Sequence, residues 1–306
     1  MSKKTNTRTI DFISAFCENG ELYQLTRFVN DNSKDLNLLF RGNSSDMGTV
    51  VVYYNNHIFW KINRLASGYN LIISFKHARK HPDNESIKEK VIDEFKFIET
   101  NNGYYRRKIL NNEKISYDFF RDFFVFWKLI MDYYYREVKN EKEKIRQQEL
   151  FNKYKETKDG YFIYDLEYAS QHENKKAREN DKDNNKPDFL AIRFENSIPQ
   201  AMVIGEVKTT SKACEDESGV IDHLKKMIRM DSRTEEIIAM KKDAAQILSD
   251  YKKMGLYNIK NLISEKEALT LPLETLFIFT DESKKWLRNN LSKVKEEYKD
   301  FNYKEY

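Results

Sequence analysis

Cysteine, proline and glycine are all scarce in this sequence, with two, four and nine copies among 306 residues. Cys17 and Cys214 stand in unrelated contexts, and neither has a metal-ligand neighbour at zinc spacing. A disulfide framework and a zinc site are therefore not expected, and both thiols are predicted to be reduced. The chain also shows no internal repeat, no phosphate-binding glycine loop and no nucleophile elbow, so nothing in it indicates ATP dependence.

Long apolar runs are missing as well. No window approaches eighteen uninterrupted apolar residues, so a membrane-spanning helix is not expected. The first six residues, Met-Ser-Lys-Lys-Thr-Asn, are polar and carry no apolar signal core. Together with the reduced thiols, these features predict a cytoplasmic protein without a membrane partner.

Charge is abundant but nearly balanced. Charged residues make up 33% of the chain and hydrophobic residues 40%, with a formal net charge of +4. This composition is typical of a soluble globular protein, and so mild an excess does not by itself indicate a polyanionic partner. The 19 tyrosines and 20 phenylalanines reflect either AT-rich coding DNA or rings that stack on bases, and the sequence leaves both readings open.

The first third of the chain predicts an N-terminal α+β domain over residues 1–115. Apolar residues at roughly helical spacing between residues 12 and 28 indicate a helix. Short β-branched and aromatic runs then predict two or three hairpin-linked antiparallel strands. These runs cover residues 36–40, 49–54, 57–62 and 69–75.

A long helix is predicted to connect this domain to the rest of the chain. Residues 117–134 carry a wide apolar face of phenylalanine, tryptophan and tyrosine, which is typical of a core-facing helix. Residues 137–155 are highly charged, so the second half of the same helix is expected to face solvent. The connecting helix opens a second domain over residues 116–306.

The remaining sequence predicts a mixed β-sheet flanked by helices, which makes the protein an α/β (α+β mixed) chain. A polar run at residues 172–186 reads as a loop between the first two strands. The predicted strands cover residues 161–168, 189–194, 201–207 and 276–280, and the helices cover residues 221–230, 235–254 and 282–298.

Two short motifs stand out within these strands. Asp188 follows Pro187 and opens an apolar strand, while Glu206 and Lys208 lie two residues apart on the next strand. Side chains two apart on a strand point to the same face, so Glu206 and Lys208 share one side of an otherwise apolar element. Burying such a pair without compensation is expensive, and a bound cation would compensate.

The same residues fit the chemistry of phosphodiester hydrolysis. Mg²⁺ prefers one or two carboxylates together with water and phosphate oxygens, which Asp188 and Glu206 would supply, and Mn²⁺ can substitute for it. Lys208 would orient the attacking water, help to deprotonate it and offset charge on the phosphate. The seventeen residues between Asp188 and Glu206 are enough for a hairpin, with its turn at Asn196 and Ser197.

The pair of motifs resembles the PD-(D/E)xK, or restriction-endonuclease-like, nuclease superfamily. The pattern stands here as Pro187-Asp188 and Glu206-Val207-Lys208, within a helix–strand–strand–strand–helix–strand order over residues 140–285. The resemblance implies that Asp188 and Glu206 are metal ligands and that Lys208 is the catalytic lysine. It also implies a restriction-endonuclease-like core and a Mg²⁺-dependent nuclease, with an endonuclease of restriction or defence type expected.

Further site residues follow from the resemblance by position. A glutamate on the helix before the first strand often adds a metal ligand in this superfamily, which makes Glu149 and Glu156 candidates. Glu167 on the first strand is a third candidate. A glutamine on the later helix, in some branches followed by a tyrosine, points to Gln246 with Tyr251. Ordinary surface charges and a plain amphipathic helix explain these residues as well.

The histidines form no evident metal set. His172 and His223 flank the motif region without a His or Cys partner at ligand spacing. His77 and His81 are expected to lie in a basic surface turn.

Nucleic acid is the expected partner, with DNA ahead of RNA. Cations on the helix after the motif could follow a phosphate backbone, although ordinary solvated helix faces explain them equally. These candidates are Lys225, Lys226 and Arg229. The N-terminal domain, with Arg41, Lys61, Arg64, Lys76, Arg79 and Lys80 around its strands, is expected to serve in recognition or interaction. A homodimer is left open, and a non-catalytic nucleic-acid-binding or assembly protein that retains the nuclease fold is the alternative function.

Overall fold

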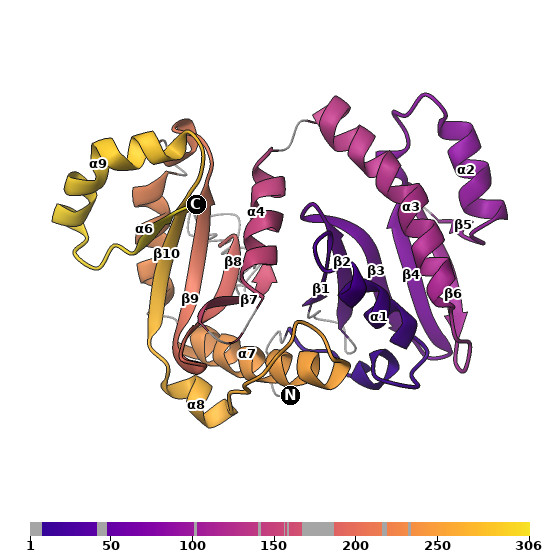
Figure 1. The fold of residues 1–306 in the computed structure, drawn as a ribbon, viewed down its shortest axis with the longest axis horizontal. Helices are drawn as coiled ribbons and strands as arrows, with labels where there is room; N and C mark the ends of the chain where they lie inside the picture. Colours follow the sequence, from indigo (N-terminus) through magenta and orange to yellow (C-terminus); the bar gives the residue numbers. More distant parts are fainter. Residues whose placement is uncertain are drawn as a thin grey trace, which may run out of the picture. The chain divides into compact units, whose positions relative to one another are not determined.

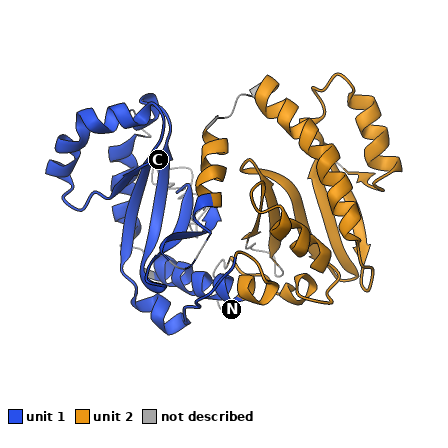
Figure 2. Ribbon diagram, in the orientation of Figure 1, with its two compact units in different colours: residues 1–7, 153–249, 258–306 blue, residues 8–152, 250–257 orange. Residues whose placement is uncertain are grey.

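The protein consists of two compact units, coloured separately in Figure 2. The computed structural model describes residues 8–41, 48–100, 103–139, 142–155, 157, 159–166, 187–215, 219–231 and 234–306. We call residues 8–152 with 250–257 the N-terminal unit, and residues 153–249 with 258–306 the C-terminal unit. The mixed α/β class is confirmed, since each unit combines a β-sheet with helices.

The units divide the chain at residue 152, whereas the sequence suggested a boundary near residue 115. The difference arises because the helix that begins at Tyr117 belongs to the N-terminal unit. Its apolar face packs on the sheet of that unit, with the rings of Phe120 and Phe123 5.5 and 5.8 Å from Trp60. Residues 250–257 also return to this unit, where the Tyr257 hydroxyl bonds to the backbone N–H and C=O of Leu38 at 2.6 and 2.8 Å.

The prediction of one long connecting helix is wrong. The segment forms α3 (Tyr117–Tyr133), a π-helical stretch η4 (Tyr134–Lys139) and a separate helix α4 (Lys142–Lys153). The second half does not face solvent either, because Gln147, Gln148 and Phe151 are buried. Asn56 explains the buried glutamines: its backbone N–H donates to Gln148 at 3.0 Å, and its side-chain amide donates to Gln147. Charge density alone did not reveal these polar contacts.

The N-terminal unit is built on a six-stranded antiparallel sheet in the order β1-β2-β3-β4-β6-β5. Figure 1 shows α1 and α3 together with this sheet. The strands are β1 (Leu36–Arg41), β2 (Thr49–Tyr54), β3 (His57–Leu65), β4 (Gly68–Ser74), β5 (Ile98–Glu99) and β6 (Tyr104–Leu110). The helices besides α3 and α4 are η1 (Ile13–Phe16), α1 (Tyr23–Asp31), η2 (Phe75–His77) and α2 (Asn84–Asp93). The four runs singled out in the sequence fall on β1, β2, β3 and β4, so all four form strands where two or three were expected, and the sequence missed β5 and β6.

The C-terminal unit carries a five-stranded mixed sheet in the order β11-β10-β9-β8-β7. Strands β7, β8 and β9 form an antiparallel meander, while β10 runs parallel to β9 and to β11. The strands are β7 (Gly160–Leu166), β8 (Phe189–Glu195), β9 (Ile198–Lys208), β10 (Leu273–Phe279) and β11 (Tyr303–Glu305). The helices are η5 (Lys212–Cys214), α6 (Val220–Asp231), α7 (Thr234–Met254), α8 (Glu265–Thr270) and α9 (Ser283–Glu297).

The predicted elements of this half of the chain occur in the structure in the predicted order, whereas the sequence missed helix α8 and strand β11. The predicted loop 172–186 and the last two residues of the predicted strand 161–168 lie outside the described residues. Within the described part of the chain, no helix combines the length and the apolar run that a membrane crossing requires.

Candidate active site

The candidate site is carried by a tight hairpin of β8 and β9. Glu195 pairs with Ile198, so only Asn196 and Ser197 form the turn. Their φ angles of 49° and 66° are left-handed, which is the geometry that matches a two-residue hairpin to the twist of its strands. The turn sets the register as far as Phe194, and a β-bulge between Arg193 and Phe194 then shifts the pairing by one residue. The shifted register places the Asp188 end of β8 beside Glu206.

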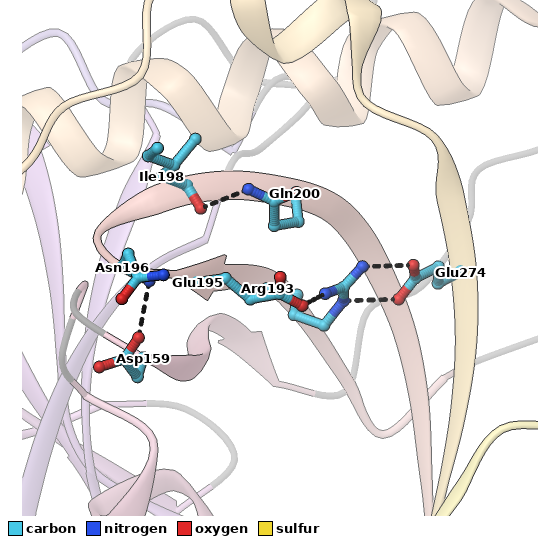
Figure 3. A network of polar contacts seen from close by, with 7 residues as sticks. All are labelled: Asp159, Arg193, Glu195, Asn196, Ile198, Gln200 and Glu274. Carbon is cyan, nitrogen blue, oxygen red and sulfur yellow. Dashed lines mark hydrogen bonds and ion pairs between the residues drawn. The ribbon is translucent and has the colours of Figure 1, made fainter.

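Polar contacts hold the turn end of this hairpin in place, as Figure 3 shows. The guanidinium of Arg193 on β8 donates two hydrogen bonds, of 2.9 and 2.8 Å, to Glu274 on β10, and it also contacts Glu195. Because β9 lies between these strands, the bidentate pair clamps three strands together. Asp159 accepts the backbone N–H of Asn196 at 2.7 Å. These contacts anchor the hairpin on the face opposite to Glu206.

A glycine allows the two strands to pack closely behind the site. Gly205 pairs with Phe189, whose ring covers it on the face opposite to Glu206. A Cβ atom at position 205 would lie 1.9 Å from Cζ of Phe189, far inside van der Waals contact. The glycine is thus required by packing rather than by a turn.

Gly205→Ala is therefore expected to lower the free energy of unfolding by about 1–3 kcal/mol, because the buried Phe189 ring must move. Urea titration followed by far-UV circular dichroism measures the loss. Phe189→Leu in the same chain should recover part of it, because the smaller side chain leaves room for the new methyl group. An alanine variant as stable as the parent would show that the ring does not constrain this position.

Glu206 and Lys208 share one face of β9, as the strand alternation predicts. Their side chains are only 3% and 7% exposed, and Nζ of Lys208 lies 3.6 Å from Oε2 of Glu206. The carbonyl of Lys208 accepts hydrogen bonds from the N–H of Thr280 at 2.9 Å and from the hydroxyl of Ser283 at 2.5 Å. The start of the segment that leads into α9 thus fixes the end of β9 that carries the pair.

Asp188 lies at the start of the neighbouring strand. Its Oδ2 atom accepts a hydrogen bond from the backbone N–H of Val207 at 2.8 Å. Because Val207 stands between Glu206 and Lys208 in the sequence, this bond fixes the Asp188 carboxylate against that part of β9. The pairing of Phe189 with Gly205 places Asp188 opposite Glu206. The structure therefore brings together the three residues that the motif singled out.

His223 joins this group from α6. Its Nδ1 atom lies 2.7 Å from Oε1 of Glu206, a close contact that lacks the alignment of a hydrogen bond. Burial and the positive charge of Lys208 lower the pKa of His223 to about 4, although the charge of Asp188 opposes the shift. The imidazole is therefore neutral at pH 7. The sequence offered no signal for this contact, because it depends on how α6 packs over the sheet.

Asp165 on β7 is a further acidic residue on this face, and it is fully buried. A β-bulge between Ile163 and Asp165 shifts the register, so that Asp165 pairs with Leu190. Leu190 pairs in turn with Ile204, which shares its face with Glu206. Simple alternation would place Asp165 on the face of Ile163, and the bulge turns it to the other side. An aspartate inside an apolar strand was the signal that could have identified it.

The donor set suits a hard divalent cation. Among the described residues, no group of three or more His, Cys, Asp or Glu side chains stands at metal-ligand spacing. Mg²⁺ does not require one, because it is commonly held by one or two carboxylates while water and phosphate oxygens complete its shell. Glu206, buried beside a cationic group and fixed close to Asp188, provides oxygen ligands of this kind.

No contact between the other predicted site residues and this group is seen in the described part of the chain. Glu149 lies on α4 in the N-terminal unit, where its carboxylate pairs with Arg146 at 2.6 Å. Gln246 is exposed on α7, and Tyr251 is buried within the N-terminal unit. Glu156, Glu167 and His172 lie outside the described residues.

The predicted nucleic-acid-binding cations on α6 are partly neutralised. Lys226 pairs with Asp222 at 2.7 Å, one helical turn away, and Lys225 lies 3.8 Å from Glu297. Arg229 is exposed on the same helix. Such pairs are typical of a solvated helix face, and they leave less positive charge available for phosphates.

No protein-family model, curated protein or solved structure matches this chain.

Proposed function

We propose that the protein is a divalent-metal-dependent nuclease that hydrolyses phosphodiester bonds in DNA, as an endonuclease of restriction or defence type. The observation that carries the proposal is the convergence of Asp188, Glu206 and Lys208 at one end of the β8–β9 hairpin. Two of these charged side chains, those of Glu206 and Lys208, are almost fully buried. Burying charged groups costs free energy, and such arrangements are concentrated at functional sites.

Asp188 and Glu206 are the residues that would hold Mg²⁺ or Mn²⁺. When bound, the cation supplies a Lewis acid for the phosphate and lowers the pKa of a water molecule. Lys208 places a positive charge beside the same carboxylates, where it stabilises negative charge that develops on phosphate oxygens. Neutral His223 restricts the rotation of the Glu206 side chain through close contact. Asp165 adds a further carboxyl group to the same sheet face.

The topology of the C-terminal unit supports a restriction-endonuclease-like core. An antiparallel meander of β7, β8 and β9 is followed by α6 and α7 and then by a parallel strand, β10. This order, with the acidic residues on the second and third strands, is the layout that the resemblance implies. A fold of this kind hosts several functions, so the argument for hydrolysis rests on the site residues.

A substrate panel tests the proposal. The purified chain should cleave plasmid or linear duplex DNA in Mg²⁺ or Mn²⁺ and lose this activity in EDTA. Single-stranded DNA and RNA in parallel reactions define the substrate class, and linear against circular DNA separates end-dependent from internal cleavage. Cleavage that persists in EDTA, or the absence of cleavage of every substrate with either metal, would reject a metal-dependent nuclease.

A further inference from the structure

One face of the sheet in the N-terminal unit gathers cations that have no acidic partner. Cross-strand pairing places Lys61 next to Ile72 and Ile72 next to Arg106, and it places Asn70 next to Lys108. We call the surface formed by Lys61, Asn63, Asn70, Tyr104, Arg106 and Lys108 the basic sheet face. Along the described strands β1–β4 and β6, this side of the sheet carries no aspartate or glutamate.

Three consecutive residues on β6 show how the sheet separates its charges. Arg107 points toward the helices, where it lies 4.3 Å over the Phe119 ring and 3.8 Å from Glu113. Arg106 and Lys108 point the other way and are exposed. Neither of these two residues, nor Lys61, forms an ion pair within the described part of the chain. The unneutralised charge of Arg106 and Lys108 therefore lies on the side of the sheet that faces away from these helices.

Other groups on the basic sheet face favour a ligand that carries negative charge and also has planar rings with polar edges. Tyr104 is 47% exposed on the same side of β6 as Arg106. Asn70 is 8% exposed and lies between Asn63 and Lys108 in the register. Its amide oxygen finds no hydrogen-bond partner among the described residues. Cations that follow a backbone, together with rings for stacking, are the features of surfaces that bind nucleic acid.

The spacing of the cations suits a polyanion with regular charges. Arg106 and Lys108 are two residues apart on a strand, which separates their Cα atoms by about 6.6 Å. Lys61 lies two strands away from Arg106, at about 10 Å. We propose that the basic sheet face binds the sugar–phosphate backbone of DNA and thereby holds the substrate on the N-terminal unit. The inference rests on the proposed function for its choice of nucleic acid as the partner.

Binding is tested apart from cleavage by using the full chain in EDTA with a fluorescein-labelled DNA duplex and the matching single strand. The variant K61E/R106E/K108E should bind at least about 100-fold more weakly at low salt, because three phosphate contacts are lost and reversed. The slope of log K against log salt should fall by about 3. Circular dichroism reports whether the charge reversal disturbs folding. If it does, the milder variant K61A/R106A/K108A, which removes the same three positive charges, should still show the same change in slope.

A charge-matched control is K90E/K114E/R121E, in which exposed cations of the same unit are reversed. Lys90 and Arg121 already pair with carboxylates at 3.5 and 2.7 Å, so this variant should bind within about twofold of the parent. Equal losses in both triple variants, unchanged binding in the face variants, or a parent chain that binds neither DNA would overturn the proposal. If DNA binding depends on the basic sheet face but the chain never cleaves DNA, the result rejects the proposed nuclease activity and leaves the binding proposal standing.

Discussion

Replacement of Asp188 by asparagine is expected to lower the rate of metal-dependent DNA cleavage by about 10³-fold, because a charged metal ligand is lost. Asparagine keeps an oxygen that can accept the Val207 N–H, so the hairpin should remain folded. Glu206→Gln is expected to cause a loss of similar size. Rates are measured with saturating Mg²⁺ on the substrate that the panel identifies.

The matched control for these variants is Glu195→Gln. Glu195 is the last residue of β8, the strand that begins directly after Asp188. Its side chain is 62% exposed at the turn end of the hairpin. Its variant should keep the parent rate within about twofold, since an exposed ion pair contributes little. Similar rates in all three variants would show that the hairpin carboxylates take no part in hydrolysis.

Acidification is expected to destabilise the N-terminal unit strongly, because two of its histidines are buried without charge. The ring of His57 stacks on Tyr135 at 3.4 Å between centroids, and Nε2 of His77 lies 2.8 Å from the hydroxyl of the same tyrosine. Burial, together with the positive charge of Lys144, lowers the pKa of His57 to about 2. Burial, together with the positive charge of Lys76, lowers the pKa of His77 to about 3. His77 was expected in a surface turn, and its burial corrects that prediction.

The sign follows from proton binding. Below about pH 6.5 the unfolded chain protonates both histidines while the folded unit does not, so stability falls as the pH decreases. Each histidine contributes about 1.4 kcal/mol per pH unit, so a decrease from pH 6.5 to 4.5 should cost up to about 5 kcal/mol. The loss continues until the pH reaches the folded pKa values.

Tryptophan emission reports this unit selectively once Trp286→Phe removes the tryptophan of the C-terminal unit. Trp60 and Trp127 are then the remaining fluorophores, and both are fully buried. Urea titrations at several pH values give the slope in the parent background, in His77→Gln and in His57→Asn/His77→Gln. The single variant should reduce the slope by about half. A stability that is independent of pH, or an unchanged slope in the double variant, would contradict the assignment.

The strands around the candidate site could be predicted from the sequence because local signals agreed. The apolar run after Asp188, the Asn196-Ser197 turn and the Glu-x-Lys alternation all act over a few residues, and together they predict the hairpin. They do not predict its register at the site, because a β-bulge between Arg193 and Phe194 shifts the pairing that brings Asp188 opposite Glu206. Strand alternation fixed the common face of Glu206 and Lys208, and the structure confirms it.

The features that were missed depend on long-range packing. The bulge in β7 that turns Asp165 toward the site leaves no mark in the hydrophobic pattern. The contact of His223 with Glu206 requires α6 to pack over the sheet. Strand β6 carries three consecutive cations, Arg106, Arg107 and Lys108, at its centre, and they interrupt the apolar alternation that would have identified the strand. The return of residues 250–257 to the N-terminal unit is likewise set by tertiary contacts, such as that of Tyr251 with Phe40 at 5.0 Å between rings.

Anomalous diffraction from crystals soaked in Mn²⁺ tests the central claim most directly, because it locates the cation without reference to any substrate. We expect a peak at about 2.2 Å from carboxylate oxygens of both Asp188 and Glu206, which Asp188→Asn should weaken or remove. Mn²⁺ bound only at other carboxylates, with none between these two side chains at saturating concentration, would contradict the proposed metal-dependent nuclease site.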